Sequence, residues 1–442
     1  MYALSFGLKA QYAFQNLRYN ENYSYLRKDS TGSWYNRMKY SKLTANTTSY
    51  FTQGGEVRYL IQHYTNEDWG DIPVKSYNSF YTRFLYHTDI HFSKYFRFFN
   101  QFNSTFATGR VTPNRAVDEN VLAIQQIFFD VQLIPQLTLR IGRQELLYGS
   151  QRLIAVREGP NNRQSYDAAK VFWKKNNLQL DAYYSYPVRV QQGIFDDGFN
   201  EQEKLWSVYT VLTSVPIVHN IDLYYIGYAN QNKRYNAGEG EELRHSIGTR
   251  IWKKSATWNY DFEALYQVGS WSNQSINAYT ASLDISYQFN EVNTKPTVGL
   301  KTEIISGDKN NNDYQLNTFN PLFPRGAYFG LAALIGPVNL IDFHPNFSIK
   351  PFKNFEVSAD YDVFWRYSVN DGIYGPNVAL IFNDQSSNRF IGHQVGLAVA
   401  YQPNAFITLS PEAMWFYPGQ YLKEVSPGKQ VFFGAFTAQF KF

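Results

Sequence analysis

Alternation of large aromatic and polar side chains along short extended segments is the feature that most constrains how this chain can fold. The last such segment, residues 431–442, would place two sets of side chains on opposite faces of a strand. The aromatic face carries Phe432, Phe436, Phe440 and Phe442, and the polar face carries Thr437, Gln439 and Lys441. In a chain rich in such segments, this pattern fits a closed cylinder with lipid outside and water inside.

The composition favours the same architecture. The 442 residues include 36 Tyr and 35 Phe, yet the mean hydropathy is −0.42. No apolar run approaches the roughly 18 residues that a membrane-spanning helix needs. A membrane protein without such helices has to be a closed barrel, because every backbone amide and carbonyl in the hydrocarbon layer needs an internal partner.

Cysteine content and charge exclude several other classes. The chain has no cysteine, which removes disulfide frameworks, thiolate metal sites and cysteine nucleophiles. Its net charge of +4 is small for this length, so nothing points to nucleic acid as a partner or to a polybasic membrane anchor. Charge is therefore expected to act locally.

Turn residues divide the chain into alternating segments that predict an all-β fold, a single transmembrane antiparallel β-barrel of the outer-membrane type with about 18 strands. An even number of strands lets the two ends of a single-chain barrel meet on the same side of the membrane. The expected strands are residues 49–64, 78–92, 95–108, 121–133, 136–147, 166–175, 178–187, 205–215, 219–231, 244–254, 257–269, 277–289, 295–305, 337–350, 355–368, 391–403, 405–417 and 429–442.

The connections between these segments alternate between short polar turns and long loops, as periplasmic turns and outer loops do in such barrels. The long connections are 188–204, 306–336 and 369–390. We assign 49–442 to the barrel and 11–48 to an N-terminal periplasmic or plug segment. Residues 1–10 are either a signal-peptide remnant or a strand.

Strand parity predicts which side chains line the lumen, because successive side chains leave opposite faces and the apolar set must meet lipid. Arg140 is expected to face inward, since Leu139 and Ile141 face lipid. The same rule sends inward a mixed-charge set that includes Glu56, Arg58, Arg83, Asp360, Asp362 and Gln394. Most of these charges are expected to pair with one another and keep the lumen wet.

A run of motifs carries a resemblance to a known family. The stretch Leu137–Leu153, with Gly142-Arg143-Gln144 at a strand end, leads through a loop to Tyr166-Asp167-Ala168 at the next strand start. Further motifs are Asn22–Leu26, Gly54–Arg58, Asn320–Tyr328, Phe364–Arg366, Gly392–Gln394 and the final strand. In order and spacing, this set resembles the alginate export family of outer-membrane porins.

The resemblance implies an 18-stranded barrel whose arginine-rich constriction passes an anionic polysaccharide of uronic acids. Arg143 and Arg366 match the family's motif positions and are the first candidates for contacting carboxylates, followed by Arg58, Arg83 and Arg163. A planar guanidinium pairs with a carboxylate through two hydrogen bonds. Because Arg140 and Arg143 cannot both face the lumen in an unbroken strand, a bulge near Gly142 would be needed to re-aim Arg143.

Metal and catalytic sites find little support, so we predict no metal, no cofactor and no enzyme. His87 and His91 have the spacing of a helical metal site, but on a strand they lie roughly 13 Å apart. The Asp308–Asp313 segment imitates the start of a calcium loop without its glycine or its closing glutamate. None of the seven histidines pairs convincingly with a serine.

The leading hypothesis is an outer-membrane channel for anionic or polar carbohydrate, selective through inward Arg/Lys and Asp/Glu ladders and gated by a folded loop at 306–336. Its partners would be outer-membrane lipid and the anionic oligo- or polysaccharide, or small polar solutes; any periplasmic partner is unknown. One alternative is a barrel plugged by 12–48 that serves as a surface scaffold without solute flux. Another is a barrel hydrolase.

Overall fold

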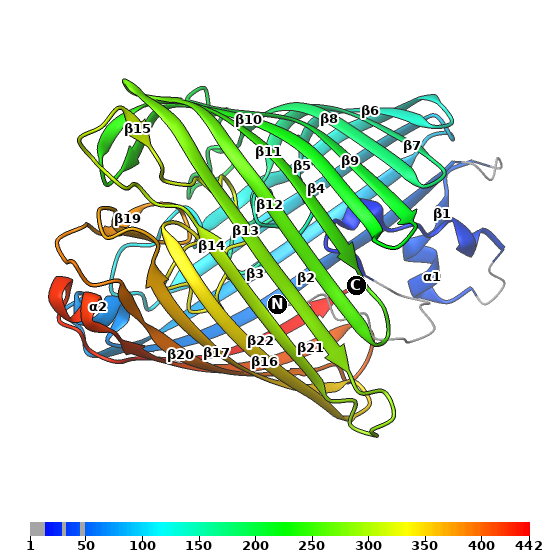
Figure 1. Ribbon diagram of the computed structural model, residues 1–442. Helices are drawn as coiled ribbons and strands as arrows, with labels where there is room; N and C mark the ends of the chain where they lie inside the picture. The colour runs from blue at the N-terminus through cyan, green and yellow to red at the C-terminus, as the bar shows by residue number, and fades with distance from the viewer. Residues whose placement is uncertain (1–13, 29–31, 45–48) are drawn as a thin grey trace.

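The computed structural model describes residues 14–28, 32–44 and 49–442, and the possible signal-peptide remnant at 1–10 lies outside them. The fold is a closed barrel of 18 antiparallel strands (Figure 1). The barrel strands are β2 (Tyr50–Thr65), β3 (Ser76–His91), β4 (Phe96–Thr108), β5 (Asn120–Ile134), β6 (Leu137–Gln144), β7 (Tyr166–Lys175), β8 (Leu178–Pro187), β9 (Glu203–Val215), β10 (His219–Tyr235), β11 (Gly238–Lys253), β12 (Trp258–Trp271), β13 (Gln274–Gln288), β14 (Thr297–Ile305), β16 (Leu340–Phe352), β17 (Phe355–Arg366), β20 (Phe390–Tyr401), β21 (Ile407–Pro418) and β22 (Val431–Lys441).

Each of these strands pairs with its neighbours along the chain, and β2 pairs with β22 to close the cylinder. The smaller elements are β1 (Ser41–Lys42), β15 (Gln315–Leu316), β18 (Ile373–Tyr374), β19 (Leu380–Phe382), α1 (Trp34–Lys39), α2 (Gln420–Val425), and the 3-10 turns η1 (Arg18–Asn20), η2 (Ser24–Lys28) and η3 (Glu67–Gly70). No helix in the described part of the chain is long and apolar enough to cross a membrane.

The alternation seen in the sequence becomes an inside and an outside. On β4, Gln101, Asn103 and Thr105 are buried, whereas Phe106 on the opposite face is exposed. The fold class expected from this alternation is confirmed, and each expected strand corresponds to one barrel strand whose ends differ by a few residues. The largest difference is at β10 and β11, which continue past their expected ends to a tight turn at Asn236 and Ala237.

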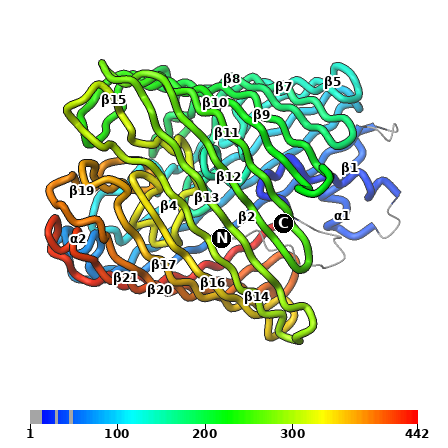
Figure 2. Tube along the Cα trace, viewed as in Figure 1, coloured from blue at the N-terminus to red at the C-terminus, as the bar shows by residue number. Residues whose placement is uncertain are grey.

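The two ends of the barrel differ in the length of their connections. At one, here called the turn end, the connections are short, such as 92–95, 135–136 and 353–354. At the other, called the loop end, the long connections include 145–165, 306–339 and 367–389. Figure 2 shows α1 and β1 at the opposite end of the barrel from β15, β19 and α2.

The N-terminal segment is tied to the turn end of the lumen. Arg18 donates hydrogen bonds to the backbone oxygens of Gly55 and Phe442, at 3.0 and 2.9 Å. Lys39 is fully buried and donates from Nζ to the backbone oxygen of Gln53 at 2.9 Å. These contacts join residues 14–28 and 32–44 to the strands that close the barrel.

Two long loops fold back into the lumen and pair with each other. They are residues 145–165 and 306–339, here called the constriction loops. Ile154 and Phe323 form a parallel β-bridge, and Ala155 donates its backbone N–H to the Phe323 oxygen at 3.0 Å. Both side chains belong to a buried hydrophobic cluster that also contains Tyr166 and Tyr228 of the barrel strands. The lumen therefore contains a hydrophobic core formed by the two loops and the barrel strands.

Candidate channel constriction and solute cavities

A network of arginine and glutamate side chains joins one constriction loop to the barrel strands. Arg83 forms ion pairs with Glu56 at 2.6 Å and with Glu158. Arg163 lies 3.1 Å from Glu145 and 3.3 Å from Glu158. The predicted residues Glu56, Arg83 and Arg163 thus come together, and Glu158 of the 145–165 loop pairs with both arginines.

Arg58 joins the same network through the loop backbone. Its guanidinium donates to the backbone oxygens of Glu158 and Pro160, at 2.8 and 2.9 Å. A third hydrogen bond, of 3.2 Å, reaches the Oδ1 of Asn161. Because these acceptors are carbonyl and amide oxygens, Arg58 holds the loop against the strand without a carboxylate partner of its own.

The two loop glutamates differ in how their charge is stabilised. Burial raises the pKa of Glu145 to about 7, although Arg163 opposes this shift. Burial alone would also raise the pKa of Glu158, but Arg83 and Arg163 outweigh it and the pKa of this carboxyl lies below its ordinary value. Near neutral pH, Glu145 is therefore the carboxyl of this network that can change charge.

Arg140 faces the lumen, as strand parity predicts. Its Nε lies 2.6 Å from Asp130 on the neighbouring strand. Its guanidinium carbon lies 4.1 Å from the ring centre of Tyr19 and 3.9 Å from that of Phe128. The N-terminal segment thus places an aromatic ring over this arginine.

The predicted residues Asp360, Asp362 and Gln394 meet around His344 on the far side of the lumen. His344 Nδ1 lies 2.6 Å from Asp362, and Gln394 donates to Asp362 at 2.5 Å and to the backbone oxygen of Phe329 at 2.8 Å. His344, Asp360 and Asp362 offer ligand atoms within 4.8 Å of one another, a spacing that could hold a metal ion. Their present contacts anchor the 306–339 loop at Phe329.

Arg366, a first candidate for contacting a solute carboxylate, directs its guanidinium to the backbone of a loop. Its guanidinium makes five hydrogen bonds, all to backbone oxygens of loop 367–389, namely those of Val369, Asp371, Ser386 and Asn388. It also lies 4.1 Å from the ring centre of Tyr421. Arg366 is fully buried and fixes the course of this loop.

The bulge expected at Gly142 does not occur. Pairing of β6 with β5 and β7 continues through Gly142 and Arg143 without a register shift. Gly142 has a φ of +131°, and a Cβ there would meet the backbone oxygen of Ile127. Arg143 therefore stays on the outward face with Ile141, where it pairs with Asp167 at 2.9 Å.

Of the charged loop residues, sequence reasoning selected Arg163 but missed Arg152, Arg157 and Arg325. Arg152 pairs with Glu303 and lies 3.3 Å from Glu263. In contrast, no carboxylate among the described residues lies within ion-pair distance of Arg157 or Arg325. Arg157 donates to the backbone oxygen of Pro324 at 3.3 Å, and Arg325 to that of Tyr328 at 3.4 Å. Strand parity does not apply to loops, so the charge of these arginines was the only sequence signal that could have identified them.

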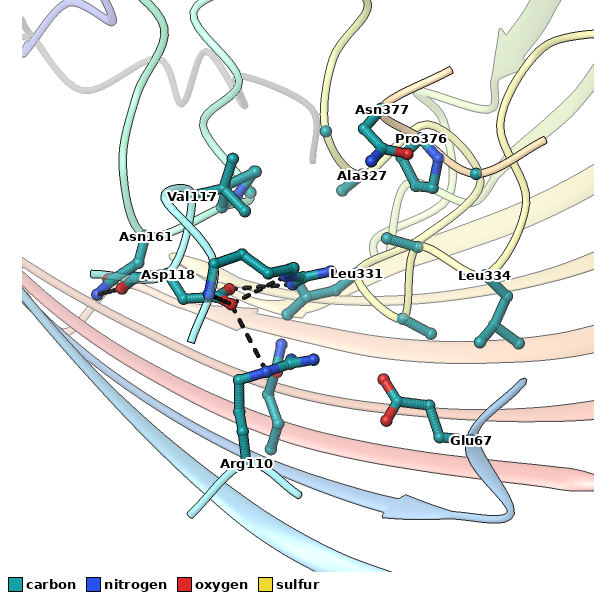
Figure 3. A pocket seen from close by; sticks show the side chains of 18 of the residues that line it. Glu67, Arg110, Val117, Asp118, Asn161, Ala327, Leu331, Leu334, Pro376 and Asn377 are labelled. Atoms are coloured by element: carbon teal, nitrogen blue, oxygen red, sulfur yellow. Dashed lines mark hydrogen bonds and ion pairs between the residues drawn. The ribbon is translucent and has the colours of Figure 1, made fainter. Parts of the chain in front are cut away.

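The constriction loops line two cavities. The outer cavity, toward the loop end, has a volume of about 590 Å³. Figure 3 shows Arg110, Asp118 and Asn161 on one side of it and Leu331, Leu334 and Pro376 on the other. Arg157 also lines this cavity, whereas Arg110 and Arg115 lie 3.5 and 2.9 Å from Asp118.

The inner cavity, toward the turn end, has a volume of about 150 Å³. Charged groups of both signs dominate its lining, and the cations include Arg325, which has no carboxylate partner among the described residues. The charged residues are Arg152, Arg250, Lys254, Asp261, Asp284, Lys301, Glu303, Arg325 and Asp342. A polar solute passing along the lumen would meet both cavities and the loops between them.

Comparison with known proteins gives the same picture of the fold. Similar solved structures include a BenF-like porin from Pseudomonas fluorescens Pf-5, with a TM-score of 0.60, 8% identity, and coverage of 89% of this chain and 98% of that one. Another is Pseudomonas aeruginosa OccK2 (OpdF) in complex with glucuronate, with a TM-score of 0.58, 10% identity, and coverage of 89% and 98%. At such identities the likeness shows the fold alone. No curated protein sequence matches the chain.

The family is shown by sequence. The alginate export family matches residues 49–435, most of the chain and nearly the whole barrel. The resemblance noted in the motifs is thereby confirmed. The chain belongs to the alginate export family, and it is a porin-type channel of the bacterial outer membrane.

Proposed function

We propose that this channel passes anionic or polar carbohydrate through the lumen, past the arginines of the constriction loops. The observation that carries the proposal is the pair Arg157 and Arg325. Each lines a cavity, and each lacks a carboxylate partner among the described residues. Both arginines are half-buried, and a guanidinium without a carboxylate partner can bind the carboxylate of a solute.

The remaining charges of the lumen support this role in a different way. Arg83, Arg163 and Arg152 are neutralised by glutamates, so they hold the loops in place and contribute little free positive charge. Selectivity would then depend on a few unpaired arginines, since reduced dielectric strengthens each such charge. In this proposal, the paired charges on the strands hold in place the loops that carry the unpaired arginines.

The test is a current recording on the purified protein in a planar bilayer. A polyuronate should block the current, and a neutral oligosaccharide of equal length should block it much less. Equal block by both would indicate a general porin without selectivity for the anionic polymer. Absence of any current would contradict a channel of this kind.

A second candidate, the plugged scaffold, is favoured by one observation. Tyr19 donates its hydroxyl to the backbone oxygen of Glu145 at 2.8 Å, and Arg163 donates to that of Asn16 at 2.7 Å, so the N-terminal segment reaches a constriction loop. Deleting residues 12–48 separates the two functions. A plugged scaffold would gain conductance, and an open channel would change little.

A further inference from the structure

The outer cavity has two chemically different sides. Arg110, Arg115 and Asp118, from loop 109–119, make one side polar. Loops 306–339 and 367–389 make the opposite side largely apolar, through Leu331, Leu334 and Pro376 (Figure 3), and Ile381 of the second loop also lines the cavity. A solute that fills this space must present a charged or polar edge to one side and an apolar face to the other.

The charges on the polar side are mostly satisfied within the protein. Asp118 accepts two hydrogen bonds from the Arg115 guanidinium, at 2.9 and 3.0 Å, and Arg110 donates to Thr112 at 2.9 Å. Arg157 is different, because its described hydrogen bond goes to a backbone oxygen. Arg157 is half-buried, and its partial burial lowers the pKa of the guanidinium from its ordinary value.

The size of the cavity limits the solute. At about 590 Å³, it falls in the range of roughly 300–1,000 Å³ typical of sites for small ligands. The constriction loops bound it on the inner side through Gly326 and Ala327. A polymer threaded through the lumen would need a continuous groove here, whereas this space suits a molecule of one or two rings.

We propose that the outer cavity is a binding site for a small cyclic carboxylate, held by Arg157 through its carboxylate and by Leu331 and Leu334 through one face of its ring. The inference rests on the proposed function and deepens it by naming the class of solute. Uronic acids and aromatic acids share this chemistry. The aliphatic side favours a ring with a fully apolar face.

The test is equilibrium binding of radiolabelled benzoate and glucuronate to the purified full chain in detergent, with benzamide and glucose as neutral analogues. We expect at least one of the two acids to bind and both neutral analogues to bind much more weakly. The acid that binds more tightly shows whether the site prefers an aromatic acid or a uronic acid. Failure of both acids to bind would overturn the inference.

Variants locate the binding in the cavity. Arg157→Gln should weaken binding at least about tenfold, since a charge-assisted hydrogen bond is lost, and Arg157→Lys should keep part of it. Leu334→Ala should weaken benzoate more than glucuronate. Arg189→Gln is the matched control, because Arg189 is an exposed arginine at the loop end that lines neither cavity. Parent-like binding by Arg157→Gln would overturn the assignment.

The inference and the proposed function can fail separately. Block of the current by polyuronate without binding of either acid would keep the channel and remove the cavity site. Binding of an acid by a protein that carries no current would keep the site and remove the channel.

Discussion

The outer and inner cavities border the same two constriction loops, yet they measure about 590 and 150 Å³ and differ in their linings. The outer one combines an apolar side with one unpaired arginine. The inner one is lined mainly by charges of both signs. The difference teaches that the two faces of one loop pair can carry different chemistry, one face largely apolar and the other charged.

The largest effect should follow from removing the part of loop 306–339 that separates the two cavities. Replacing residues 319–329 by a short Gly-Ser linker removes Phe323, Tyr328 and Phe329 from the lumen core. The two cavities should merge, and single-channel conductance in planar bilayers should rise several-fold. Shortening loop 188–202 is the control, since that loop bridges to Leu122 through Ile194 and lines neither cavity. An unchanged conductance would contradict the role given to the constriction loops.

Arg366 offers a way to disturb the outer cavity alone. Arg366→Ala leaves the backbone oxygens of loop 367–389 without their donor, and this loop supplies Pro376 and Ile381 to the outer cavity. The free energy of unfolding should fall by about 3 kcal/mol, as expected when buried acceptors lose their partner. Thermal unfolding in detergent measures this loss.

The matched control for that variant is Arg389→Ala, because Arg389 makes one hydrogen bond, to the Tyr367 oxygen, in an exposed setting. Its stability should stay close to that of the parent. Acid binding in the outer cavity should weaken in Arg366→Ala, and uronate block from the turn end should not. Equal loss at both ends would show that the cavities are not separable.

A substitution at Arg325 tests the inner cavity separately from the outer one. Arg325→Gln should weaken block by uronate added at the turn end by about tenfold, or ~1.4 kcal/mol, because a charge-assisted contact is lost. Block from the loop end should change little. Lys353→Gln, which removes an exposed charge from the turn at 353–354, serves as the control. The measurement is current block with solute added to one chamber at a time.

The smallest expected effect is a pH dependence confined to the outer cavity. Asp68 lines it, and burial, followed by repulsion from Glu67 and Asp71, raises the pKa of Asp68 to about 6. Above this pH the carboxylate repels an anionic solute, and below it the neutral acid does not. Acid binding should therefore strengthen a few-fold as the pH falls through about 6.

Asp68→Asn should bind the acid at high pH as the parent does at low pH, and its binding should vary much less over this range. Asparagine tolerates the left-handed conformation of Asp68, whose φ is 50°, so the substitution adds little strain. A pH dependence that persists in the variant would assign the titration to another group.

Strand parity predicted the positions of the barrel residues well, because lipid on one side and the lumen on the other leave each side chain two directions. Arg58, Arg83 and Asp362 all lie on the inward face, as expected. The partners of Arg366 could not be predicted, since they are backbone oxygens of a loop whose path has no period. Strand parity also placed Arg143 on the outward face; only the family motif suggested the lumen for it, and the bulge which that would need at Gly142 does not occur.

The loops show the limit of the same reasoning. Arg157, Glu158 and Arg325 carry charge in segments without alternation, and their positions depend on the pairing of Ile154 with Phe323, two residues from different loops. A pattern read along one strand contains no information about such a contact. The family resemblance indicated an arginine constriction but not which arginines remain unpaired.

The contact of Arg18 with both Gly55 and Phe442 has a consequence for the order of assembly. Gly55 lies on the first barrel strand and Phe442 follows the last, so the two acceptors stand side by side only once β2 and β22 have joined. During insertion, Arg18 can therefore make both hydrogen bonds only after the seam is closed. Protection of the N-terminal segment from a protease should mark the moment at which the cylinder is complete.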